Sequence, residues 1–128
     1  MKNLIKLEEA AMFGLSIYLF SLLGLPWWWF PLLILVPDIG MIGYLVSPQV
    51  GAVTYNLTHH RLVAIVVLLV GFYHGSVWVE MAGIVLFGHA AMDRVFGYGL
   101  KFSDSFHHTH LGWIKPPETS VNDVRNID

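Results

Sequence analysis

Apolar residues run along most of this chain in long stretches, separated by short breaks that carry glycine or proline. No charged residue occurs from Ala10 to Pro37. At about 1.5 Å per helical residue, this stretch exceeds one crossing of a hydrocarbon core of about 30 Å. Gly24-Leu25-Pro26 supplies a break inside it, and an aromatic belt at Trp27-Trp28-Trp29 follows. The pattern therefore predicts two helices, over about residues 7–24 and 27–47.

Two further apolar stretches follow in the second half of the chain. The break at Pro48 precedes a predicted helix over about residues 53–73, whose polar side chains are all near its start. Gly75-Ser76 precedes a fourth predicted helix, over about 77–97. Hydrophobic residues make up 55% of the chain and charged residues 12%, about half the charged share of a soluble protein. We therefore expect an all-α bundle of four transmembrane helices.

The positions of the basic residues predict how this bundle is oriented. Lys2 and Lys6 precede the first helix, and Arg94, Lys101 and Lys115 flank the last. Both termini are therefore predicted to be cytoplasmic, in a multi-pass protein of the bacterial inner membrane. The transmembrane domain is expected over residues 1–114, with a histidine-containing cytoplasmic segment at 98–114. Residues 115–128 are expected to form a polar, mobile tail.

Composition also restricts the partners and the chemistry. The net charge is −2 and the basic residues are scattered, which argues against nucleic acid as a partner. Membrane lipids are the expected partners. Gly40, Gly43, Gly83 and Gly88 offer surfaces for close helix contact, either inside the bundle or in a homodimer. The chain has no cysteine, so a metal site would use histidine, carboxylate or water.

The strongest chemical signal lies near the end of the fourth predicted helix. His89 and Asp93 are four residues apart and project from one helix face. Imidazole and carboxylate are suitable ligands for zinc, iron or manganese. The alternative is a buried histidine that is merely hydrogen-bonded to an aspartate one turn away.

Other polar residues occur at similar predicted depth in the other helices. Asp38 follows Pro37 within the second apolar stretch, where a carboxylate needs a partner. It is expected to be a ligand or a proton carrier, and the alternative is a protonated aspartate that caps the broken backbone. In the third helix, Asn56 shares a face with His59 and also with His60, and we favour His59. After the fourth helix, His110 is the expected ligand, with His107 or His108 as its alternatives.

These observations combine into one predicted site in the cytoplasmic half of the bundle. Its divalent metal is expected to be zinc, iron or manganese. Asp38 and Glu8 are the candidate catalytic residues, and Arg94, Lys101 and Asn56 are the candidates for substrate binding. The expected metal ligands are His59, His89, Asp93 and His110.

Five sequence runs carry a resemblance to a known family: LEEAAMF, PDIGMIGYL, GAVTYNLTHH, GHAAMDRVFGYGLKF and THLG. They resemble a domain-of-unknown-function family of small bacterial integral membrane proteins, over nearly the whole chain up to Gly112. The resemblance implies a compact four-helix membrane protein. It also implies recurring polar positions at Glu8, Asp38, Asn56, His59, His89, Asp93, Arg94, Lys101 and His110. The Pro-Asp pair and the His-Asp spacing are also similar to those of membrane-bound metal-dependent hydrolases.

Three classes of function follow from this pattern. The first is a metal-dependent enzyme that hydrolyses an ester or phosphoester of a membrane lipid, or oxidises a lipid at a di-iron site. The second is a structural or interaction protein whose polar network joins the helices, at about 0.6 kcal/mol for each interhelical hydrogen bond. The third is a proton-coupled transport subunit in which Asp38 and Asp93 exchange protons with His89.

Overall fold

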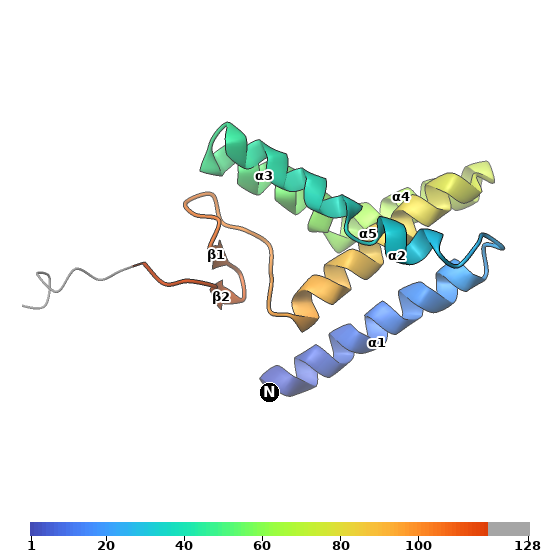
Figure 1. Ribbon diagram of the computed structural model, residues 1–128, viewed down its shortest axis with the longest axis horizontal. Helices are drawn as coiled ribbons and strands as arrows, with labels where there is room; N and C mark the ends of the chain where they lie inside the picture. Colours follow the sequence, from blue (N-terminus) through green and yellow to red (C-terminus); the bar gives the residue numbers. More distant parts are fainter. Residues whose placement is uncertain (118–128) are drawn as a thin grey trace, which may run out of the picture.

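The chain forms a mostly helical fold, seen in the computed structural model in Figure 1. The structure describes residues 1–117. The part of the predicted tail that follows Pro117 therefore lies outside the described residues. The described part contains five α-helices, one 3-10 helix (η1) and one two-stranded hairpin. They are α1 (Lys2–Ser21), α2 (Trp29–Leu33), η1 (Val36–Leu45), α3 (Pro48–His59), α4 (Arg61–His74), α5 (Val77–Val95), β1 (His108–Thr109) and β2 (Gly112–Trp113).

Helix α5 is the central element, because α1 and α4 both pack along it (Figure 1). The apolar core lies beside it and contains Phe20, Phe30, Met81, Ile84 and Val85. Helix α1 approaches α5 closely at Gly88, where a Cβ atom would lie 3.0 Å from the Cβ atom of Ser16. Gly88 and the residue that follows it, His89, are both buried.

A second close packing joins η1 to α3. The Thr54 hydroxyl donates a hydrogen bond to the Gly40 carbonyl over 2.6 Å. A Cβ atom on Gly40 would lie 2.7 Å from the Thr54 carbonyl oxygen, so a larger residue could not occupy this position without displacing backbone. The contact places the start of η1, including Asp38, against the C-terminal end of α3.

The second predicted helix, 27–47, is divided in the structure. It consists of the five-residue α2 and the ten-residue η1, joined at Ile34 and Leu35. Pro37 has no N–H group to continue a helical hydrogen-bond ladder. The Asp38 N–H donates to the Leu35 carbonyl, three residues back, over 3.2 Å. The break therefore follows from the proline that the apolar pattern contains.

The third predicted helix, 53–73, is also divided. Helix α3 begins earlier than expected, with Pro48 at its first position and the Ser47 side chain accepting from the Val50 N–H. It ends at His59, because His60 adopts an extended backbone with ψ of 122°. The His60 Nδ1 atom accepts from the Leu62 N–H over 3.1 Å and caps α4.

The length and composition of the helices bear on whether they could cross a membrane. In the described part of the chain, no single helix is both long and apolar enough to cross a bilayer. The pair α3 and α4, bent by 48° at His60, passes by length and composition when taken together. Charged residues fall inside the two longest helices, such as Lys6 in α1 and Arg94 in α5. The four-span bundle therefore stays a prediction.

Candidate metal centre

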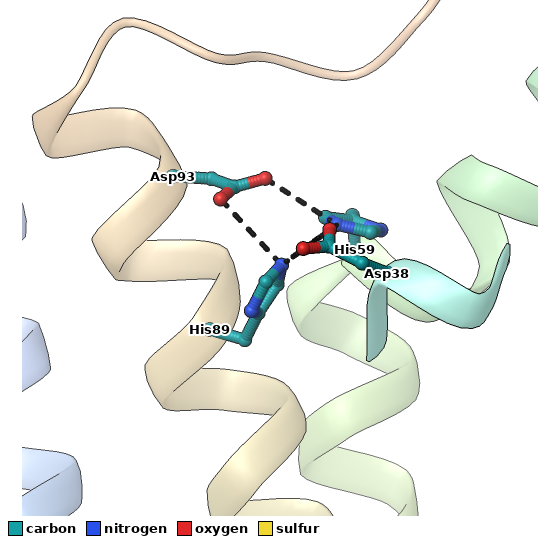
Figure 2. Close-up of side chains that lie close together, drawn as sticks. All are labelled: Asp38, His59, His89 and Asp93. Atoms are coloured by element: carbon teal, nitrogen blue, oxygen red, sulfur yellow. Dashed lines mark hydrogen bonds and ion pairs between the residues drawn. The ribbon is translucent and has the colours of Figure 1, made fainter. Parts of the chain in front are cut away.

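Four side chains from three elements converge beside α5 (Figure 2). Asp38 comes from the first turn of η1, His59 from the last residue of α3, and His89 and Asp93 from α5. Each offers one potential ligand atom, and these atoms lie within 4.8 Å of one another, so the group could hold a metal ion. We call these four residues the His–Asp centre.

The His89 ring is oriented by the break before η1. Its Nδ1 atom lies 2.5 Å from the Ile34 carbonyl oxygen. In a 3-10 turn this carbonyl would accept from residue 37, but Pro37 has no N–H group. The Asp38 N–H, which would bind it in an α-helix, donates to Leu35 instead. The Ile34 carbonyl is therefore available to His89, whose side chain is fully buried.

The His59 ring is oriented by its own helix. Its Nδ1 atom lies 2.8 Å from the Tyr55 carbonyl oxygen and 2.9 Å from the Thr58 hydroxyl. The ring also stacks on the Tyr55 ring, with 3.7 Å between the centroids and 12° between the planes. The Nε2 atom of His59 consequently points away from α3 and toward α5 (Figure 2).

These contacts determine which ring nitrogen of each histidine carries the proton. A carbonyl oxygen can only accept, so each Nδ1 atom must donate its hydrogen to a carbonyl. In a neutral imidazole the Nε2 atom is then an acceptor without a proton. The two Nε2 atoms nevertheless face each other over 2.9 Å. Two lone pairs pointing at each other at this distance need a proton or a metal cation between them.

The two carboxylates add further acceptors at the same place. Asp38 Oδ1 lies 3.1 Å from His89 Nε2 and 3.3 Å from His59 Nε2. Asp93 Oδ2 lies 3.3 Å from His59 Nε2, and its Oδ1 lies 3.5 Å from His89 Nε2. The Tyr55 hydroxyl donates to Asp93 Oδ2 over 2.9 Å. The centre is therefore lined by acceptors, and one of its carboxylates is oriented by a neighbouring donor.

The spacing of these atoms matches the size of a single ion. Ligands bound tetrahedrally at about 2.0–2.1 Å are separated from one another by about 3.3 Å. The five distances above, in which Asp93 contributes a different oxygen to each histidine, range from 2.9 to 3.5 Å, and one ligand atom from each of the four residues lies within 4.8 Å of the others. The residue types agree as well, because imidazole nitrogen and carboxylate oxygen are ligands for zinc, iron and manganese.

Exposure differs within the centre and shows the direction of access. The side chains of His59 and His89 are 3% and 0% exposed, and that of Asp93 is 14% exposed. The Asp38 side chain is 39% exposed. Solvent or a ligand would therefore reach the centre past Asp38.

Two sequence-predicted residues lie outside the centre. Glu8 is exposed on α1, whereas its neighbour Glu9 is buried and forms an ion pair with Arg61 Nη2. His110 is also exposed, and its Nδ1 atom accepts from the Leu100 N–H over 2.8 Å. The structure thus brings together four of the metal-site residues expected from the sequence and leaves Glu8 and His110 apart.

Asn56 and Lys101, predicted to bind substrate, contact each other. The Asn56 amide donates to the Lys101 carbonyl over 2.8 Å and accepts from its N–H over 2.7 Å. The Lys101 ammonium lies 4.0 Å from the centroid of the Phe106 ring and 4.9 Å from that of Tyr55. Burial lowers the pKa of Lys101 from its usual range. These contacts attach the segment 98–114 to α3.

The remaining predicted residues also have identified neighbours. Arg94 donates from Nη1 to the Ala90 carbonyl over 3.1 Å, and it lines a small pocket together with His59 and Asp93. His108 lies 2.7 Å from an Asp104 carboxylate oxygen, and this contact lowers the pKa of Asp104. Arg94 is therefore the candidate substrate-binding residue that lies beside the centre.

The sequence analysis did not identify two groups that contact the residues of the His–Asp centre. Tyr55 contacts both Asp93 and His59, and its position one helical turn before His59 was the available signal. The second is the Ile34 backbone carbonyl, which orients His89, and nothing in the Ile34 side chain indicates this contact. Its use could have been inferred from Pro37, which removes the backbone donor.

Comparison with known proteins gives one match. Residues 2–114 match the family described as Domain of unknown function (DUF4260). No curated protein and no solved structure matches the chain.

Proposed function

Since the chain belongs to the family described as Domain of unknown function (DUF4260), we propose a function from its geometry: a metal-dependent hydrolase that acts on a membrane lipid. One observation carries the metal: the Nε2 atoms of His59 and His89 face each other over 2.9 Å while each Nδ1 atom contacts a backbone carbonyl. A divalent cation between them satisfies both nitrogens and both carboxylates.

The donor set supports one ion rather than two. The four ligand atoms lie within 4.8 Å of one another, whereas the metals of a two-metal site are themselves about 3.5–4 Å apart. Glu8 and His110, which would enlarge the set, lie elsewhere on the chain. This favours hydrolysis at a mononuclear centre over lipid oxidation at a di-iron site.

The exposures within the centre support a division of roles. Catalytic sites of this kind use three protein ligands and keep one position for water. We assign the three less exposed residues, His59, His89 and Asp93, as ligands. These residues would hold a divalent ion, whose chemistry would be to lower the pKa of a water molecule. Asp38, at the accessible side, would take the proton from that water as its oxygen attacks the ester carbon or phosphorus, and would return the proton to the departing alcohol oxygen as the ester bond breaks. Arg94 is placed to bind an anionic group of the substrate.

Surface composition supports a lipid as the substrate. Large apolar side chains are exposed on several elements, with Trp27 at 78%, Leu45 at 85% and Phe72 at 76%. Extended apolar surface of this kind is typical of membrane or protein contacts. Together with the bent pair α3 and α4, it supports an integral protein of the bacterial inner membrane.

Metal analysis of purified variants tests the proposal. The wild type, His89→Ala and Asp93→Ala are prepared in detergent without chelator, and zinc, iron and manganese are measured. We expect a single bound ion in the wild type and a loss of bound metal in both variants. His60→Asn is the matched control, because it removes the exposed imidazole next to a ligand and keeps a side chain that can cap α4. A folded wild type that takes up no supplied metal would contradict the proposal and leave a proton between the two imidazoles.

The role of Asp38 is tested separately. Asp38→Asn keeps the size of the side chain and removes its basicity, so we expect metal to be retained and hydrolysis of fluorogenic esters or phosphodiesters to be lost. Loss of the metal in this variant would instead make Asp38 a required ligand.

A further inference from the structure

A second feature adjoins the His–Asp centre on the side of α2 and η1. A cleft with a volume of about 260 Å³ lies between this broken segment and α5. Eight of its nine lining residues are apolar, and Thr58 of α3 is the exception. Ile39 and Val36 form part of its wall and are themselves 68% and 51% exposed, so the cleft is open to the surroundings.

The wall of the cleft is continuous with the centre. Thr58 lines the cleft, and its hydroxyl lies 2.9 Å from His59 Nδ1. Pro37 lines it and directly precedes Asp38. Val85 and Leu86 line it from α5, one helical turn before His89 and on the same face. Two of the four centre residues, His59 and Asp38, are thus sequence neighbours of cleft residues, and a third, His89, lies one helical turn from the cleft.

We propose that this cleft binds an acyl chain of an ester-linked membrane lipid and thereby presents the ester or phosphoester group to the centre. The inference rests on the proposed hydrolytic function and specifies its substrate class. Walls without hydrogen-bonding side chains, apart from Thr58, match a hydrocarbon chain, which gains about 0.8 kcal/mol for each methylene removed from water. Continuity with the centre distinguishes this cleft from the rest of the apolar surface.

A larger apolar cavity elsewhere provides the internal comparison. It has a volume of about 470 Å³, lies between α1, α4 and α5, and is lined by residues that include Leu69, Phe72 and Glu80. None of its lining residues is a sequence neighbour of a centre residue. If apolar volume alone determined where an acyl chain binds, this larger cavity would be preferred.

Photolabelling distinguishes the two cavities. The metal-loaded wild type is embedded in bilayers that contain a phosphatidylethanolamine with a diazirine in its acyl chain, and adducts are mapped by mass spectrometry. We expect adducts at the cleft residues of η1 and α5. Ala82→Phe fills the cleft from α5 and should reduce these adducts about tenfold, the equivalent of losing about two methylene contacts. Ala82→Leu serves the same purpose if the phenylalanine variant does not fold.

Two controls separate the failure of this inference from failure of the proposed function. Leu69→Phe narrows the larger cavity and should leave both labelling of the cleft and metal content unchanged. His89→Ala should lose metal and keep the label. Equal labelling in the wild type and Ala82→Phe, or labelling only by a free fatty acid with the same diazirine, would overturn the acyl-chain site. Cleft labelling of a wild type that binds no metal would overturn the proposed function alone.

Discussion

Two buried polar groups in this molecule differ in how their charges are balanced. Glu9 on α1 pairs with Arg61 on α4, so one protein side chain compensates the other. In the His–Asp centre, two carboxylates and two Nε2 acceptors face one another, and the Tyr55 hydroxyl reaches Asp93 alone. In the first arrangement the two charges balance without a ligand. The second needs either a proton on an Nε2 atom or a metal cation between the two rings, so it can bind a ligand where the first cannot.

Removing the metal should have the largest effect on the centre. A ligand present at a thousandfold its dissociation constant stabilises the folded state by about 4 kcal/mol. We therefore expect chelator to lower the free energy of unfolding of the wild type by about this amount, measured by denaturant titration in detergent. His89→Ala should show no response to chelator. An identical unfolding curve with and without chelator would place the centre in the same class as the Glu9–Arg61 pair.

Breaking the Glu9–Arg61 pair should reduce stability without affecting metal. Glu9→Gln leaves the Arg61 guanidinium without its carboxylate, and since Arg61 is 31% exposed we expect a loss of about 2 kcal/mol, less than for a fully buried pair. The double variant Glu9→Gln/Arg61→Met should recover much of this loss. Unfolding and metal content are measured on the same samples. A drop in metal content would show that the two groups are coupled.

Removing the Tyr55 hydroxyl should weaken the centre moderately. Tyr55→Phe keeps the ring that stacks on His59 and deletes the donor to Asp93. Loss of such an outer-shell partner lowers metal affinity by about tenfold or more. Competition with a chromophoric chelator measures the affinity, and the cobalt(II) absorption spectrum should shift.

Tyr44→Phe is the matched control for this change. The buried Tyr44 hydroxyl has no hydrogen-bond partner within residues 1–117, so its removal should leave the affinity unchanged. Equal metal affinities for the wild type, Tyr55→Phe and Tyr44→Phe would mean that metal binding by Asp93 does not depend on the Tyr55 hydroxyl.

The smallest effect is expected where α3 contacts the C-terminal segment. Asn56→Ala removes two hydrogen bonds to the Lys101 backbone and should cost about 1 kcal/mol. Hydrogen exchange over residues 98–114 should become faster, while metal content stays constant. Leu57→Ala, an exposed neighbour on the same helix, should change neither. Loss of metal in Asn56→Ala would extend the centre to this segment.

The sequence predicted the helical fold and the members of the centre that carry a chemical signal. Apolar runs indicate helices, and His89, Asp93 and Asp38 stand out because charged or titratable groups are rare within such runs. Helix breaks were harder to locate. Pro37 marks one of them, but the break at His60 depends on an extended residue and a side-chain cap that follow from packing.

Two pairs of identical adjacent residues show what could not be predicted from the sequence, namely which member of each pair is buried. Glu8 and Glu9 are adjacent, as are His59 and His60, and each pair has one buried and one exposed member. Successive helical residues point about 100° apart, so the orientation of α1 against its neighbours decides that Glu9 is buried. His60 lies at the break after α3, where its side chain caps α4 instead. Sequence reasoning favoured Glu8 and His59, and the structure buries Glu9 and His59.

The segment between Ile34 and Asp38 contacts both nitrogens of one imidazole, with the Ile34 carbonyl 2.5 Å from His89 Nδ1 and Asp38 Oδ1 3.1 Å from His89 Nε2. The number of residues in this segment therefore determines how the His89 ring is held. A change of residue at Leu35 or Val36, whose side chains are exposed at 60% and 51%, leaves that length intact. An insertion or deletion there alters both contacts at once. We therefore expect evolution to vary Leu35 freely and to keep Val36 apolar as part of the cleft wall, while the number of residues between Ile34 and Asp38 stays constant.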